Sequence, residues 1–216
     1  MVLRRFLNSS IGKKQLLALS GFFLSIFLVV HLAGNLLILK SIETFDQYAM
    51  ALMHNPMIIP AEIILAFIFL SHIFLGIKIS IENKRARPVS YAFGKRSEGR
   101  KSLASSTMIY SGVWILIFLV LHIKQFKYGD HVSQTLGALV ISAFQSPYYV
   151  VWYWVSMGVV GLHLSHGLWS MFQTWGVNHP VYSVWIKRAS HVFGWTIAIG
   201  YMAIPIYIFF FKGVSL

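Results

Sequence analysis

Five histidines lie inside apolar stretches of this 216-residue sequence, at His31, His72, His122, His163 and His166. A neutral imidazole is a common metal ligand, and an imidazole can also accept or release a proton near neutral pH. Ionisable side chains are costly inside a membrane, so each of these histidines suggests a functional site. Any one of them alone could instead be a core histidine bonded to a neighbouring helix. The choice between metal ligand and core residue depends on how the five are arranged.

The other histidines and the lack of cysteine limit the kinds of metal site that this chain could form. His54, His131 and His179 fall in polar connections and His191 lies near a membrane interface, where solvated or capping imidazoles are expected. The sequence contains no cysteine. Disulfides, thiolate metal sites and cysteine-ligated iron–sulfur clusters within this chain are therefore excluded. Histidine is the main metal-ligand type that remains.

The elements that position these histidines are predicted to be membrane-spanning helices. The sequence is 57% hydrophobic and only 11% charged, which is too apolar for an ordinary soluble domain. Five segments reach the roughly 20 apolar residues that a helix needs to cross a bilayer. The first is too long for a signal peptide and lacks a clear small-residue cleavage site. We predict an all-α membrane protein, one domain over residues 1–216, with spans at about 15–39, 58–81, 105–125, 149–172 and 189–211.

The basic residues indicate which ends of the spans face the cytoplasm, because short loops rich in Lys and Arg are retained there. They are concentrated in the N-terminal segment and in the connections after the second and fourth spans, so the N-terminus is predicted to be cytoplasmic and the C-terminus external. These loops account for the net charge of +12, and no nucleic-acid partner is expected. The residues are Arg4, Arg5, Lys13, Lys14, Lys84, Arg85, Arg87, Lys95, Arg96, Arg100, Lys101, Lys187 and Arg188.

The predicted spans place the histidines at two depths. At 1.5 Å per residue, His31 and His122 lie roughly 12 Å and 5 Å from the outer ends of the first and third spans. His72 and His163 lie roughly 21 Å from the outer ends of the second and fourth. Two bis-histidine haems stacked across the membrane fit this arrangement in an antiparallel five-helix bundle. His163 and His166 share a helix face, so spacing alone leaves the fourth ligand open.

Two sequence runs resemble a known family. SGFFLSIFLVVHLAGN at 20–35 and HLSHGLWSMFQTWG at 163–176 are similar to the cytochrome b membrane anchor of succinate dehydrogenases and fumarate reductases. The resemblance is closest to the type with one five-helix chain and two haems b, and it covers essentially all five spans. HLSHGLWS with its downstream QTWG is the most specific part.

The resemblance implies a ligand set and partners. One haem ligand comes from each of the first four helices, here His31, His72, His122 and His163, with the first helix paired to the third and the second to the fourth. Family members can have another residue in place of His166, which favours His163. An iron–sulfur subunit would dock on the cytoplasmic side of the bacterial membrane and hold a flavoprotein subunit with FAD and the dicarboxylate site. Electrons would pass between those subunits and a membrane quinone, commonly menaquinone in related enzymes.

Quinone chemistry also requires proton transfer, and one acidic residue is suitably placed. Glu62 is the only carboxylate inside a predicted apolar span, close to the outer end of the second. It is either an interfacial carboxylate that reaches water or a proton donor and acceptor at an outer quinone site.

Two other interpretations use the same residues. A di-haem cytochrome b of a hydrogenase or a formate dehydrogenase would share the histidines and differ in the subunits that co-purify with it. A haem-free transporter or channel would use intramembrane His and Glu as a proton relay. It would also show paired repeats interrupted by helix-breaking Gly or Pro, a pattern that we do not find.

Overall fold

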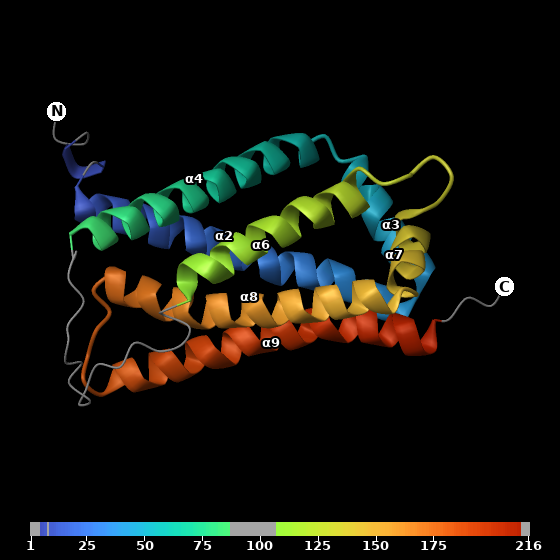
Figure 1. Cartoon of the computed structure of the whole chain (residues 1–216). Coiled ribbons are helices and arrows are strands. Elements are labelled where there is room, and N and C mark those ends of the chain that lie inside the picture. The colour runs from blue at the N-terminus through green and yellow to red at the C-terminus, as the bar shows by residue number, and fades with distance from the viewer. Residues whose placement is uncertain (1–4, 8, 87–106, 213–216) are drawn as a thin grey trace.

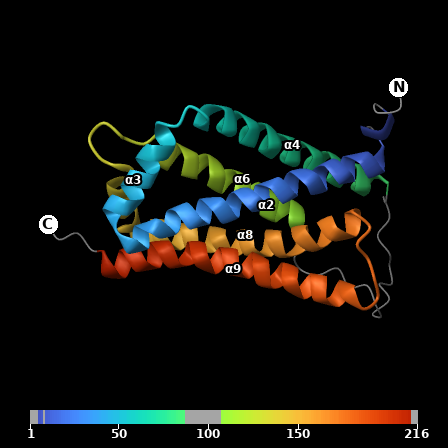
Figure 2. The ribbon, with the colours of Figure 1, turned by 180° about the vertical axis from the view of Figure 1, so that it is seen from behind.

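A computed structural model describes residues 5–7, 9–86 and 107–212, and within them the regular elements are helices, with no strand. The long helices lie alongside one another (Figures 1 and 2). Short helices α3 and α7 cover one end of the bundle, and the C-terminal end of α9 lies there too. The elements are α2 (Ser10–Lys40), α3 (Ile42–Met53), α4 (Ile58–Arg85), α6 (Met108–His122), the π-helix η1 (Ile123–Lys127), α7 (Leu136–Phe144), α8 (Pro147–Thr174) and α9 (Tyr182–Phe211).

Four helices are long and apolar enough to cross a membrane: α2, α4, α6 continued through η1, and α9. The prediction of an all-helical, multi-pass membrane protein is therefore confirmed at that level. Helix α8 also has the length, at 28 residues, but it is not among these four. Its serines, histidines and aromatic residues with polar atoms make it less hydrophobic. The fifth span stays a prediction.

The helices extend beyond the predicted spans, and two short helices were not predicted. Ser9 caps the start of α2, where its hydroxyl accepts a hydrogen bond from the Gly12 amide at 3.0 Å. Ser41 ends α2 and caps α3 by accepting from the Thr44 amide at 3.1 Å. The Asp46 carboxylate of α3 accepts from the Gly137 amide of α7 at 2.7 Å. The two short helices are thereby tied together over the same end of the bundle.

The tightest packing lies between α8 and α9. Gly161 on α8 and Gly194 on α9 face each other, and a methyl group built at Gly194 would lie 2.8 Å from the Gly161 carbonyl oxygen. Ser156 and Ser165 of α8 and Pro205 and Ile208 of α9 are almost completely buried. Small residues are what allow membrane helices to approach this closely.

Helix α4 is packed differently from α8 and α9, because none of its residues is buried. Its most exposed apolar side chains recur every three or four positions and form one stripe, which a bilayer would cover. Two ion pairs fasten its ends: Lys13 of α2 pairs with Glu82, and Lys127 of η1 pairs with Glu62. The stripe consists of Ile59, Ile63, Phe67, Leu70 and Phe74.

Candidate functional site

The inner histidine pair consists of His72 on α4 and His163 on α8. Their ring centres lie 6.4 Å apart, with the ring planes at 68°. A metal–imidazole bond is about 2 Å long, so two imidazoles on opposite sides of one metal ion have centres roughly 6 Å apart. The two rings are thus spaced as a pair of axial ligands would be.

Each inner histidine has a serine at its Nδ1 atom. The Ser20 hydroxyl of α2 lies 3.0 Å from His72 Nδ1, and the Ser111 hydroxyl of α6 lies 2.9 Å from His163 Nδ1. Nδ1 is therefore engaged in both rings, which leaves Nε2 as the nitrogen available to a metal.

The outer pair consists of His31 on α2 and His122 at the end of α6. Their ring centres lie 6.0 Å apart with the planes at 86°. His122 Nδ1 lies 3.2 Å from the hydroxyl of Tyr153, a buried residue of α8. From the position of Ser20 to that of His31 is about 16 Å along α2, so the two pairs are separated by roughly half the apolar thickness of a membrane.

The π-helix η1 follows His122 directly and directs three side chains to different partners. Gln125 lies with its amide oxygen 3.4 Å from the Tyr153 hydroxyl, and Phe126 contacts the His122 ring with a centroid separation of 5.4 Å. Lys127 reaches Glu62 on α4. Such π-helical turns within α-helices are frequent at functional sites.

His166 does not share the inner pair's position. It lies one turn along α8 from His163, is partly buried, and has His191 and Lys187 of α9 as its electrostatic neighbours. The ring that faces His72 is that of His163. Spacing along the sequence could not separate these two histidines, whereas the rotation of α8 does.

Glu62 lies near the start of α4 and pairs with Lys127. Both side chains are about half exposed, so the carboxylate is open to its surroundings. His54, His131 and His179 are exposed residues outside the long helices' cores, in agreement with the prediction for them. The basic connection after the second predicted span, on the side where the iron–sulfur subunit is expected to dock, lies largely outside the described residues.

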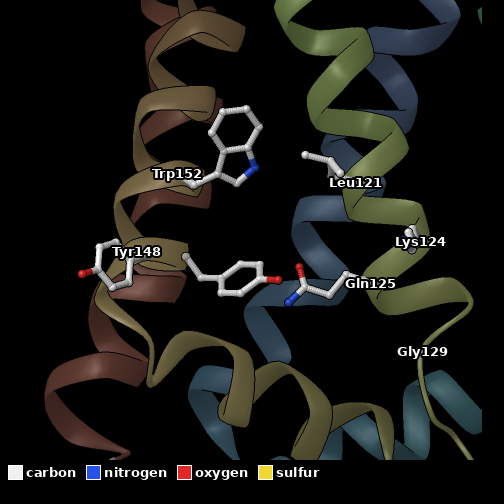
Figure 3. Close-up of a pocket in the computed structure, with 7 residues that line it drawn as sticks. Leu121, Lys124, Gln125, Gly129, Tyr148 and Trp152 are labelled. Atoms are coloured by element: carbon white, nitrogen blue, oxygen red, sulfur yellow. The ribbon is translucent and has the colours of Figure 1, made fainter.

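A cavity of about 530 Å³ opens beside the outer pair, between η1 and α8. Figure 3 shows Trp152 on α8 and Leu121 on α6 facing each other across it, with Gln125 below them. Lys124 and Tyr149 also line it. Mostly apolar walls with a few polar groups are typical of sites for small organic molecules.

The structure reveals an internal repeat that the sequence analysis missed. Ser20, His31 and His72 recur as Ser111, His122 and His163 at a constant offset of 91 residues, the difference between positions 20 and 111 and equally between 72 and 163. The repeat includes the stacking partners of the outer pair: Phe27 stacks on His31 at 5.2 Å and Phe118 on His122 at 5.6 Å. The identical serine–histidine separation of 52 residues is the signal that could have revealed it.

The repeat relates two helix pairs that run in the same direction. Helices α2 and α4 correspond to α6 and α8, and each histidine pair takes one ring from either half. Among the described helices, α9 has no counterpart.

Comparison of the chain with protein-family models, with curated proteins and with solved structures gives no match.

Proposed function

We propose that this chain is the di-haem b membrane anchor of a bacterial succinate:quinone oxidoreductase, acting as succinate dehydrogenase or fumarate reductase. The observation that carries the proposal is the two facing histidine pairs at separate depths, with ring centres 6.0 and 6.4 Å apart. The specific oxidoreductase rests on the sequence resemblance of residues 20–35 and 163–176. In this proposal α8 is the fifth membrane span.

The residues present fit haem as the group held at each pair. A bis-histidine haem would need two imidazoles from the chain, because its porphyrin would supply the remaining nitrogens. His31 and His122 would hold the outer haem, and His72 and His163 the inner one. When bound, these haems supply one-electron chemistry between the soluble subunits and quinone.

The chain's own residues would bind and orient the two haems and shield them from their surroundings. Phe27 and Phe118 stack on the outer ligands and restrict the rotation of their rings. Tyr153 and Gln125 form a polar route from His122 to the outer cavity. The iron–sulfur and flavoprotein subunits would dock on the end where α2 and α6 begin and α8 ends, because that end carries the basic segments.

Haem quantification tests the proposal directly. The purified chain is expected to bind two haems b with low-spin, bis-histidine spectra. Replacing His31 or His122 with Ala should remove the outer haem, and replacing His72 or His163 the inner one, while His166→Ala should keep both. A single haem per chain, or a high-spin spectrum, would contradict it. Co-purification of hydrogenase or formate dehydrogenase subunits would assign the same cytochrome to another complex.

The proposed quinone site lies at the outer end of the bundle. The cavity beside His122 combines the flat apolar surface of Trp152 with the amide of Gln125, which suits a quinone ring and its carbonyl oxygen. Glu62 of α4 pairs with Lys127 of η1, so the proposed proton carrier contacts the π-helix whose Lys124 and Gln125 line the cavity. Its position on the outer side would allow exchange with the external aqueous phase.

Replacing Glu62 with Gln tests that role, because the side chain keeps its shape and loses its charge. Both haems should remain, while quinone-linked turnover should fall by about 100-fold, the scale of a lost general acid–base group. Succinate oxidation with an artificial acceptor that draws electrons from the soluble subunits should be unchanged. Unaltered quinone turnover would make Glu62 only an interfacial partner of Lys127.

A further inference from the structure

The two serines beside the inner histidines occupy equivalent positions of the internal repeat. Ser20 lies 52 residues before His72, and Ser111 lies 52 residues before His163. Both serines are buried. Water therefore has little access to either serine–histidine contact, and each Nδ1 atom depends on the protein for its partner.

The direction of each hydrogen bond follows from the serine's second contact. Ser20 Oγ donates to the Leu17 carbonyl at 2.9 Å, and Ser111 Oγ donates to the Met108 carbonyl at 3.0 Å. A hydroxyl has one proton, and a carbonyl oxygen can only accept. With that proton directed to the carbonyl, the serine oxygen accepts from the imidazole, so the proton of each neutral ring lies on Nδ1. The Leu17 carbonyl is a second acceptor beside the His72 ring.

We propose that Ser20 and Ser111 are a duplicated pair of positioning residues that hold His72 and His163 in one tautomer. In this tautomer Nδ1 is protonated and the Nε2 lone pair is free, so both inner rings present the same nitrogen to a metal between them. The identity of that metal group as haem rests on the proposed function above. The tautomer itself is a property of the chain and holds without the haem.

The outer pair shows that this arrangement is specific to the inner one. His122 has the phenol of Tyr153 at its Nδ1 atom in place of a serine. The matching internal comparison is Ser25 of α2, which is also buried and donates to the backbone carbonyl of Gly21 at 2.8 Å. Ser25 bonds to its own helix in the same way as Ser20 and serves as the control position.

The first measurement uses the full haem-free chain with ¹⁵N-labelled histidine. Nitrogen chemical shifts should show His72 and His163 with the proton on Nδ1. Ser20→Ala should release only His72 into a mixture of tautomers, and Ser111→Ala only His163. Ser25→Ala should change neither, and Ser20→Thr should restore the wild-type shifts because it keeps the hydroxyl. Wild-type rings already protonated on Nε2, or rings unaffected by both Ser→Ala changes, would overturn the inference.

The second measurement uses the haem-loaded chain. Loss of an Nδ1 partner typically weakens metal binding 10- to 100-fold, so Ser20→Ala and Ser111→Ala should each weaken inner-haem retention by about that factor. The inner midpoint potential should rise, because a less basic imidazole stabilises ferric iron less, and the outer haem should be unchanged. An unchanged inner potential and retention in the double variant would overturn the inference. A wild-type chain that binds no haem would overturn the proposed function alone, since the tautomers are decided by the first measurement.

Discussion

Gly21 and Gly112 lie at equivalent positions of the repeat, next to Ser20 and Ser111, but the inner histidines leave them different amounts of room. A Cβ atom at Gly21 would lie 3.1 Å from His72 Cε1, which is tighter than ordinary contact. The same atom at Gly112 would lie 3.7 Å from His163 Cε1, an ordinary van der Waals distance. A side chain at this position would therefore press on the histidine ring only in the first half of the repeat, at Gly21.

We therefore expect Gly21→Ala and Gly112→Ala to differ. Overpacking of this kind costs about 1–3 kcal/mol, so Gly21→Ala should displace the His72 ring and weaken inner-haem retention about tenfold. Gly112→Ala should leave both haems in place and can add up to about 1 kcal/mol of helix propensity. Haem content and thermal unfolding of the two variants provide the measurement. Equal losses from both substitutions would show that the histidine contact is not the cause.

The contact of α8 with α9 shows how small side chains set the approach of two helices. Gly161 and Gly194 face each other, and a Cβ atom at Gly194 would lie 2.6 Å from Ser165 Oγ and 2.8 Å from the Gly161 carbonyl oxygen. The carbonyl belongs to the backbone and cannot rotate away. By contrast, a Cβ atom at Gly167 on α8 would have no neighbour within 4 Å.

Gly194→Ala is expected to push α9 away from α8 and to destabilise the chain by about 1–3 kcal/mol. Gly167→Ala is the matched control and should be neutral or slightly stabilising, because it adds a methyl group to open space. Thermal unfolding in one detergent compares the two variants. A Gly194→Ala chain as stable as the wild type would mean that the helices adjust without loss of packing.

The elements were predictable from the sequence to the extent that apolar length defines them. The segments 15–39, 58–81 and 189–211 lie within α2, α4 and α9, because a run of about 20 apolar residues is sufficient evidence of a spanning helix. The π-helix was not predicted, and its residues Gln125 and Lys127 contact other helices that a local sequence pattern does not specify. The serine partners of the inner histidines were not predicted either, because the rotation of each helix determines which serine faces the ring.

At the scale of the whole molecule, the repeat and the basic segments together indicate how the bundle is oriented in the membrane. Helices α2 and α6 run the same way, which places their first turns and the last turns of α4 and α8 at one end. Basic residues of the described chain gather there, including Lys13, Lys84 and Arg188. The positive-inside rule predicts that this end is cytoplasmic.

Single introduced cysteines can test this orientation, because the chain contains none of its own. Met50 on α3 and Val184 at the start of α9 are both more than half exposed and lie at opposite ends of the bundle. A membrane-impermeant maleimide should label the Met50→Cys variant in intact cells. It should label the Val184→Cys variant only after the membrane is opened. The reverse pattern would invert the topology and move the docking side with it.

Helix α4 has no fully buried residue, and this affects the order in which the helices are expected to detach. Helix α4 buries no residue and supplies one ring of the inner pair, His72, whereas the outer rings come from α2 and α6. The ion pairs at its ends are partly exposed and add little holding strength. We therefore expect α4 to detach first as detergent replaces lipid, so that the inner site opens while the outer site persists.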